Sequence, residues 1–503
     1  MIGFGEVLPL LDGVVSEGAP DDAGWRLTDG RRIVWGSAIA DGVERIDVRL
    51  DGEGPPPMSL GLRFTAVTGV ARYLRNGYQS WDGSWFAAPG EEGAEHGHAF
   101  TALDDGEGQA IVLGFERHDR FQTTFRFASD QGALTIDAET LLDRTGATAG
   151  ETLLRFSGPD VDTQARHWSR LVALASPLPP RVPKRRITGW CSWYNLYASI
   201  TPDNLREHLD AAAVFRDRHC VPLEVFQLDD GFTPEMGDWL DFRPTFPDGV
   251  KPLLAEAEAL GFRPGLWIAP FMVGNRSRLA AERPDWLVRN ATTGEPWVEM
   301  RFYGEFRWHK RSEEYHILDI THPHAAAYIA EVFRTWRHEW GGRYFKTDFM
   351  HFGSAHGPDE VAWREPGLSR IAVWRRMGAI IREAIGEDAL WLGCGCPLWA
   401  SVGLVDAVRI SRDVGVAWDG EQSHHSLFRD LPARLHANGV LWQADPDCIL
   451  LRDRFHTLSD AQVRLAAETA GAAGGVLMTS DHLGELPTDR QELFAALLRS
   501  SDL

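Results

Sequence analysis

Residues 1 to about 170 consist of short apolar runs that alternate with turn signals. Runs such as 44–50 and 123–127 have the length and side-chain content of strands, and Asp-Gly dipeptides at 29–30 and 41–42 separate several of them. Few stretches in this part have a helical period. Many short strands predict a β-sandwich, which a helical stretch at 160–176 follows.

The pattern changes after a proline-rich stretch at residues 176–183. Apolar strands then alternate with helical stretches such as 201–219 and 324–340 over roughly 300 residues, the pattern of a (β/α)8 barrel. We therefore expect a multidomain β + α/β protein, with an N-terminal β-sandwich at 1–175, a linker at 176–185 and a catalytic TIM barrel at 186–503. The expected barrel strands are 187–194, 223–228, 263–269, 344–350, 389–394, 407–410, 439–444 and 475–479, with a further strand at 315–320.

Polar residues follow most of these strands, where they would lie at the reaction face of a TIM barrel. Asp229 and Asp230 follow the second strand, Lys346 and Asp348 end the fourth, and Asp413 follows the sixth. One carboxylate after an apolar strand is weak evidence, but its repetition around one barrel is hard to explain by chance. A barrel mouth lined by carboxylates and tryptophans, without a phosphate loop, indicates glycoside chemistry, which needs a carboxylate nucleophile and a carboxyl acid/base.

Lys346 and Asp348 are two residues apart on a strand, so their side chains point the same way. A neighbouring cation would keep Asp348 ionised, as a nucleophile requires. The plainer interpretation is an ion pair at the strand end that only stabilises the barrel mouth.

Asp413 is the expected acid/base. Two nearby arginines, including Arg409, would lower its pKa, whereas burial and the charge of Asp348 would raise it. We prefer Asp413 to Asp445 and Asp447, because those two can be interpreted as a structural Asp-Pro-Asp turn.

Composition narrows the class of partner. With 72 acidic against 51 basic residues and a net charge of -21, nucleic acid is not expected, because phosphate binding needs a basic surface. The 20 tryptophans favour sugar binding, since indole stacks on sugar rings, although most are expected to fill the core. Five cysteines without a C-x-x-C motif predict neither disulfides nor a zinc site, and no cofactor is expected. No signal peptide or membrane-length apolar run is visible, so we expect a cytoplasmic protein without membrane contact.

The loop at residues 76–85 combines three aromatic residues, Tyr78, Trp81 and Trp85, with polar and glycine residues. This composition fits poorly in a core and suits a loop that reaches into a binding cleft. The alternative is a loop folded back on its own sheet.

With these motifs in this order, the chain resembles the α-galactosidases of glycoside hydrolase family 36, the melibiase group. The resemblance touches both expected domains and implies retention of anomeric configuration through a covalent glycosyl–enzyme intermediate, with no metal. The matching motifs are residues 76–81, 228–231, 265–270, 344–349 and 392–395, and the spacing of Arg409 and Asp413.

The resemblance also implies a role for each matched residue. Asp348 would be the nucleophile and Asp413 the acid/base, in agreement with the interpretation of the strand ends. The expected substrate-binding residues are Asp229, Asp230, Trp267, Lys346, Cys394, Arg409 and Trp81, to which we add Trp190 at the end of the first barrel strand.

The chain departs from the family in three features. It stops about 20 residues after the last strand, so the family's usual C-terminal antiparallel β domain is expected to be missing or vestigial. Phe232 and Tyr78 stand where many members have Trp, which would alter the ring preferred at the pocket edge.

The expected function is a retaining hydrolase of terminal α-galactosyl residues on small carbohydrates. The alternatives are a transglycosylase of the raffinose-synthase type and a hydrolase of α-N-acetylgalactosaminides, which needs more room near Cys394. A non-catalytic sugar-binding protein is a remote alternative. A metal enzyme built on His96, His98, His424 and His425 is another, although His-x-His and His-His in loops are more often solvated. The oligomeric state stays open.

Overall fold

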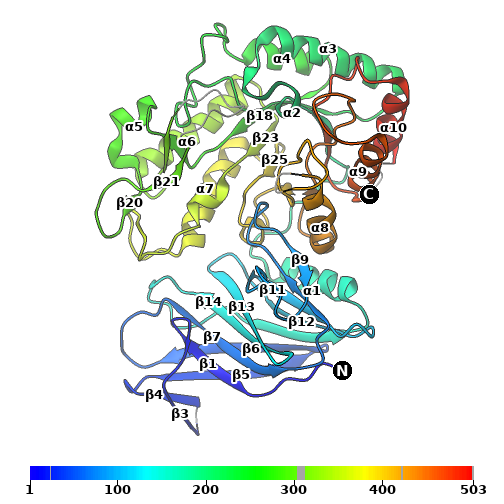
Figure 1. Ribbon diagram of the computed structural model, residues 1–503. Helices are drawn as coiled ribbons and strands as arrows, with labels where there is room; N and C mark the ends of the chain where they lie inside the picture. Colours follow the sequence, from blue (N-terminus) through cyan, green and yellow to red (C-terminus); the bar gives the residue numbers. More distant parts are fainter. Residues whose placement is uncertain (23, 303–311, 421–422, 501–503) are drawn as a thin grey trace.

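The computed structural model describes residues 1–22, 24–302, 312–420 and 423–500. It has two parts, one of antiparallel sheets and one in which helices surround a barrel of parallel strands (Figure 1). The predicted fold class, a β-sandwich followed by a (β/α)8 barrel, is confirmed. No helix in the described ranges is long and apolar enough to cross a membrane.

The N-terminal part contains two antiparallel sheets that share a core. In β6 (Val43–Asp51), Ile46 and Val48 are buried, whereas Asp47 between them is exposed, and this period of two gives the strand one apolar face. The first sheet contains, in order, β10 (His96–His98), β13 (Gln122–Asp130), β14 (Ala133–Leu141), β7 (Ser59–Val67), β1 (Val7–Leu11) and β2 (Val14–Val15). The second contains β3 (Gly18–Asp21), β4 (Gly24–Leu27), β5 (Arg32–Ala40), β6, β15 (Leu153–Gly158), β12 (Ala110–Phe115), β11 (Phe100–Asp104), β8 (Arg72–Arg75) and β9 (Trp85–Ala87).

Helix α1 (Val161–Ala175) confirms the helix predicted at 160–176. Asp160 caps its first turn by accepting a backbone hydrogen bond. Trp168 on this helix packs edge-on against Trp399 of the barrel part, with ring centroids 4.9 Å apart. The chain then runs through residues 176–187 without helix or strand, and the domain boundaries assigned around this segment stay a prediction.

Eight parallel strands form the barrel. Their order is β27 (Gln443–Asp445), β26 (Ala407–Arg409), β25 (Leu390–Gly393), β23 (Tyr344–Thr347), β18 (Arg263–Ile268), β17 (Val225–Leu228), β16 (Thr188–Cys191) and β28 (Leu477–Thr479). A single bridge between Ile449 and Thr479 joins the chain after β27 to β28 and nearly closes the barrel.

Two predicted strands differ in detail from the structure. The strand predicted at 439–444 begins only at Gln443, because Gly439 has a φ of 72° and the chain turns there. The strand predicted at 315–320 is β22 (Glu314–Ile317), which lies outside the barrel. It pairs with β19 (Met272–Gly274) and β21 (Val298–Arg301), and β20 (Arg289–Asn290) with β24 (Val361–Ala362) forms another small sheet.

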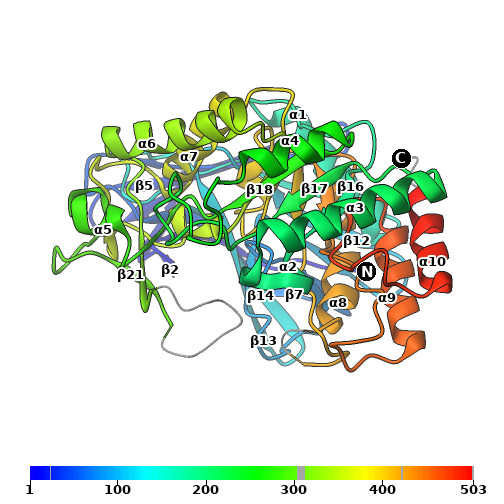
Figure 2. The ribbon, with the colours of Figure 1, turned by 90° about the horizontal axis from the view of Figure 1, so that it is seen from above.

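Helices surround the barrel (Figure 2). In α3 (Pro202–His219), Thr201 and Asn204 form a capping box at the start, and Cys220 in a left-handed conformation ends the helix. The other helices are α2 (Trp193–Leu196), α4 (Lys251–Ala259), α5 (Arg278–Glu282), α6 (Pro323–Arg334), α7 (Arg370–Ile385), α8 (His425–Arg434), α9 (Asp460–Ala472) and α10 (Thr488–Arg499).

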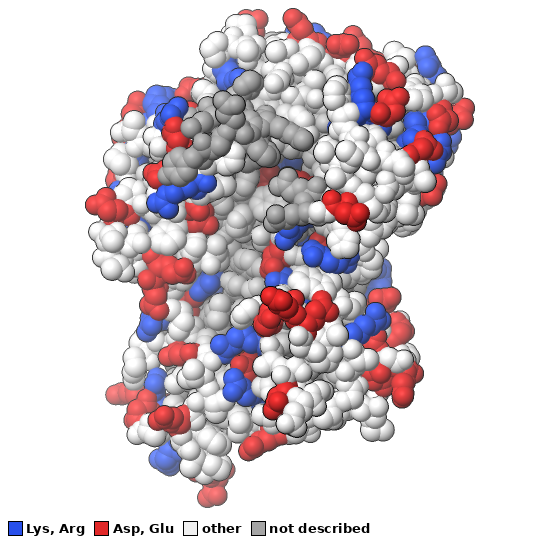
Figure 3. All heavy atoms as spheres, viewed as in Figure 1, with Lys and Arg blue, Asp and Glu red and all other residues white. Residues whose placement is uncertain are grey.

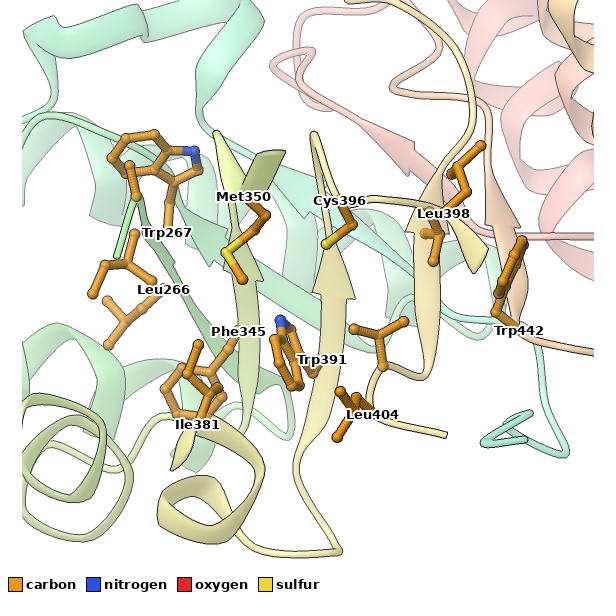
Figure 4. Packing of buried hydrophobic residues seen from close by; sticks show 14 of the residues in the cluster. Leu266, Trp267, Phe345, Met350, Ile381, Trp391, Cys396, Leu398, Leu404 and Trp442 are labelled. Atoms are coloured by element: carbon orange, nitrogen blue, oxygen red, sulfur yellow. The ribbon is translucent and has the colours of Figure 1, made fainter. Parts of the chain in front are cut away.

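The main core lies between barrel strands and helices. Phe345 of β23 and Ile381 of α7 belong to one buried cluster with Trp391 of β25, and they lie close together in Figure 4. After β28, residues 480–500 contain α10 and no strand. Acidic and basic side chains are interspersed over the face seen in Figure 3.

Candidate active site

Most of the predicted site residues line one pocket at the carboxyl ends of the barrel strands. The space between its lining atoms is about 390 Å³, part of it open to solvent. A larger hollow beside linker residues 178–183 contains none of the predicted residues. The residues that line the first pocket are Trp81, Trp193, Asp229, Asp230, Met236, Trp267, Lys346, Asp348, Phe349 and Asp413.

Asp348 follows β23 directly and is held by hydrogen bonds at both carboxylate oxygens. The backbone N–H of Phe349 donates to Oδ1 at 2.8 Å, and the indole N–H of Trp267 donates to Oδ2 at 3.2 Å. Phe349 has a φ of 51°, so the chain turns sharply just after Asp348. An ionised carboxylate only accepts hydrogen bonds, and this arrangement suits that form.

Lys346 forms its ion pair with Asp229, across the pocket, at 2.9 Å. The sequence analysis expected Asp348 as its partner, and the structure gives that place to Asp229. Burial disfavours the charged ammonium, but Asp229, Cys191 and Asp348 together outweigh it, so the pKa of Lys346 is raised well above its usual value. Lys346 is therefore a cation at the pocket floor.

Asp229 is fixed by several donors at the end of β17. Besides Lys346, the amide of Gln227 donates to its Oδ2 at 2.6 Å, and the backbone N–H of Asp230 donates to Oδ1 at 2.9 Å. Its own backbone N–H donates to the hydroxyl of Ser192 at 2.9 Å. The carboxylate of Asp229 is thus held in one orientation.

Asp413, after β26, is paired with Arg409 through Nη1 and Oδ1 at 3.1 Å. Burial and the charge of Asp447 raise its pKa to about 6, with a smaller rise from Asp348, and Arg409 opposes them. Asp413 keeps 43% of its side-chain surface accessible and lines the pocket. The balance that the sequence left open is therefore a raised pKa, with half of the Asp413 carboxyls protonated near pH 6.

Arg409 and Cys394 lie behind the pocket lining. Arg409 is buried and also contacts Asp445 at 2.9 Å and Asp447 at 2.8 Å. Cys394 is fully buried, and burial raises the pKa of its thiol well above the usual value. Neither residue is part of the pocket surface.

Trp190 does not line the pocket. Its ring is 0% exposed, stacks on Phe226 with centroids 4.6 Å apart, and donates its N–H to the backbone oxygen of Asp481 at 3.0 Å. Successive side chains of a strand point to opposite faces, and Trp190 points to the helix side, against His208 of α3. Trp193, three residues further on in α2, lines the pocket instead.

The sequence analysis missed Trp193, Met236 and Phe349 as lining residues. Trp193 lies in the same aromatic stretch as Trp190, and Phe349 directly follows Asp348, so both were within reach of the strand-end argument. Met236 follows β17 at a distance that no spacing rule marks.

The loop at 76–85 extends from the sheets to the barrel. Trp81 packs on Phe349 with ring centroids 5.2 Å apart, and Arg412 donates to its backbone oxygen at 2.9 Å. Of the two interpretations of this loop, the structure agrees with the one that brings it to a cleft. Gly77 allows the tight turn, because a Cβ there would lie 1.5 Å from the backbone oxygen of Asp82.

The described residues contain no group of three or more His, Cys, Asp or Glu side chains that could hold a metal ion. His424 lies at the start of α8, and its Nδ1 is 3.3 Å from the backbone oxygen of Ala417. The chemistry on offer in the pocket is that of carboxyls, an ammonium and indole rings.

Comparison with known proteins agrees with this geometry, since residues 190–353 match the family model described as Melibiase. This stretch of the chain is similar to a Melibiase domain. The predicted resemblance to family 36 α-galactosidases is confirmed. The melibiase match covers β16 to β23 and includes the Asp229–Asp230 pair, Trp267, Lys346 and Asp348.

Relatives support the same assignment. An α-galactosidase from Escherichia coli is 26% identical over 112 residues, and α-galactosidase Mel36A from Lactobacillus acidophilus is 30% identical over 104 residues. These matches cover 21% and 19% of this chain but only 15% and 13% of the relatives. The Thermus thermophilus α-galactosidase TtGalA, solved in complex with stachyose, is 26% identical with a TM-score of 0.73, covering 92% of this chain and 99% of that one. AgaA from Geobacillus stearothermophilus, 14% identical with a TM-score of 0.62, shares the fold over 99% of this chain and 73% of its own.

Proposed function

We propose that this protein is a retaining α-galactosidase that hydrolyses terminal α-galactosyl residues through a covalent glycosyl–enzyme intermediate. The observation that carries the proposal is the unequal environment of two carboxyls in one pocket. Asp348 accepts hydrogen bonds at both oxygens, whereas the pKa of Asp413 is raised to about 6. Retaining glycosidases need one ionised and one protonated carboxyl.

In the first step the carboxylate of Asp348 attacks the anomeric carbon while Asp413 gives its proton to the glycosidic oxygen, so the leaving group departs as an alcohol. In the second step Asp413, now a carboxylate, takes a proton from water. That water attacks the anomeric carbon, the bond to Asp348 breaks, and the sugar leaves with its configuration retained.

Asp229, Asp230 and Lys346 offer carboxylate acceptors and an ammonium donor for the ring hydroxyls of the sugar. Trp81 and Trp193 offer indole faces for its apolar side. Galactosides as the substrate class are supported by TtGalA, whose solved complexes contain stachyose and p-nitrophenyl α-D-galactopyranoside.

The test is nitrophenol release from a panel of α- and β-linked nitrophenyl glycosides, including the α-N-acetylgalactosaminide, followed by NMR of the first-formed anomer. We expect hydrolysis of the α-galactoside with α-galactose formed first. β-Galactose as first product would mean inversion and exclude Asp348 as nucleophile. Galactose binding without turnover would instead indicate a sugar-binding protein, and oligosaccharide products with an added sugar acceptor would indicate a transglycosylase.

Two variants separate the proposed roles. Asp348→Ala should abolish hydrolysis of every substrate, because no covalent intermediate can form. Asp413→Ala should keep more activity on substrates with good leaving groups, which need no protonation. Equal losses on good and poor leaving groups would contradict the role of Asp413.

A further inference from the structure

Asp447 lies two residues beyond the end of β27 and is 0% exposed at its side chain. Its backbone φ of 79° is in the left-handed region, which a residue with a side chain adopts at a cost. Its carboxylate explains why the conformation persists. The backbone N–H groups of Cys448 and Val414 each donate to it at 2.7 Å, and the hydroxyl of Tyr194 donates to it as well.

Two contacts of Asp447 lead to Asp413. Val414, whose N–H donates to Asp447, is the next residue along the chain after Asp413. The guanidinium of Arg409 binds Asp447 through Nη2 at 2.8 Å and Asp413 through Nη1 at 3.1 Å. One carboxylate therefore holds both the backbone beside Asp413 and the cation that its side chain contacts.

We propose that Asp447 is a positioning residue that holds Asp413 in place for proton transfer, through the backbone of Val414 and the guanidinium of Arg409. The role in proton transfer rests on the function proposed above. The contacts of Asp447 with Val414 and Arg409 do not depend on that function. From the sequence, Asp447 was interpreted as part of a structural Asp-Pro-Asp turn. In the structure its carboxylate also contacts the backbone of Val414 and the guanidinium of Arg409.

The same carboxylate acts on Asp413 by its charge. After burial, the charge of Asp447 is the largest influence that raises the pKa of Asp413. Arg409 lowers that pKa, but its charge is shared with Asp445 and Asp447. The other charged or titratable groups that face Asp413 are Asp348 and Lys346 from β23, Tyr194 from α2 and Cys394 after β25.

The test is Asp447→Asn, which keeps the shape of the side chain and removes its charge. The pKa of Asp413 should fall by about one unit, because a neighbouring like charge is removed and Arg409 is released to Asp413. The full-length protein labelled with ¹³C at Asp Cγ would be titrated by NMR, with Asp413→Asn to assign the signal. In kinetics, the alkaline limb of kcat/KM for an alkyl α-galactoside should move to lower pH by the same amount, with kcat reduced more than KM is changed.

Two further variants are matched controls. Asp481→Asn changes another buried carboxylate after the neighbouring strand, paired with Arg452, and should leave the titration of Asp413 unchanged. Tyr194→Phe keeps the charge of Asp447 but removes the hydroxyl that shares it, so the pKa of Asp413 should rise. A general loosening of the barrel would instead shift the pKa of Asp413 in the same direction in Asp447→Asn and in Tyr194→Phe.

An unchanged or raised pKa of Asp413 in folded Asp447→Asn would overturn the proposal. If that variant does not fold, Tyr194→Phe decides, and a fall or no change in the pKa of Asp413 overturns it. If the wild-type protein hydrolyses no glycoside, the proposed function fails, but the NMR titration still decides whether Asp447 controls Asp413.

Discussion

The environment of Asp413 predicts the alkaline side of the pH–rate profile. A general acid acts only while it holds its proton, and the pKa of Asp413 is raised to about 6. Above that pH the protonated fraction falls about tenfold for each unit, from half at the pKa to about 1% two units higher. For an alkyl α-galactoside, whose leaving group must be protonated, kcat/KM should therefore fall about 50-fold between pH 6 and pH 8.

A pair of substrates separates this effect from a loss of folding or binding at high pH. Nitrophenolate leaves without protonation, and kcat/KM reports only the steps up to the covalent intermediate. The nitrophenyl α-galactoside should therefore give a nearly flat profile over the same range. Asp413→Asn should lose about 10²–10⁴ in rate on the alkyl substrate and lose the alkaline limb with it.

Two results would refute this reasoning. One is a wild-type profile on the alkyl substrate that stays flat up to pH 8. The other is an alkaline limb that persists in Asp413→Asn with the same midpoint. Because Asp413 and Asp348 share one pocket, the midpoint alone belongs to the pair, and the variant makes the assignment.

Four other substitutions test the site and its support. Trp190→Ala should lower the free energy of unfolding by about 3–5 kcal/mol in urea titrations and leave KM unchanged. Trp193→Ala, in contrast, should raise KM. A raised KM in Trp190→Ala would mean that Trp190 contacts the substrate after all. Lys346→Met should leave the carboxylate of Asp229 buried without its cation and cost about 3–5 kcal/mol in the same titration, and a neutral effect would mean that the ion pair is not needed. Arg434→Met should raise KM about tenfold, which corresponds to the loss of one charged hydrogen bond of about 1.5 kcal/mol. An unchanged KM would show that the loop with Trp81 keeps its position without Arg434.

The barrel could be predicted from the sequence because its strands are apolar runs that alternate with helical stretches. β17 and β23 are buried along their whole length, as parallel strands covered by helices are. The limit of β27 could not be predicted in the same way. Its start depends on the turn at Gly439, and the apolar residues between that glycine and Gln443 fit a strand equally well.

The site could be predicted to the extent that the barrel brings its strand ends together. Asp229, Asp348 and Asp413 follow three different strands and line one pocket for that reason alone. The prediction that Trp190 lines the pocket was wrong, because a strand buried on both faces has no polar alternation to show which side faces the pocket. The predicted ion-pair partner of Lys346 was wrong, because spacing along one strand says nothing about the carboxylate that another strand presents.

The pocket depends on both parts of the chain, and Arg434 is the reason. This residue at the end of α8 is 2% exposed, and burial lowers its pKa to about 10, so it remains charged at neutral pH. Its guanidinium donates to the backbone oxygens of Gln79 and Ser80 in the loop of the sheets, and to that of Ile410 in the barrel. A buried guanidinium stays charged, so its donors need these acceptors, and the contacts tie the loop to the barrel. The loop that carries Trp81 is therefore held as a wall of the pocket, and the antiparallel part of the chain contributes to the pocket lining as the barrel does.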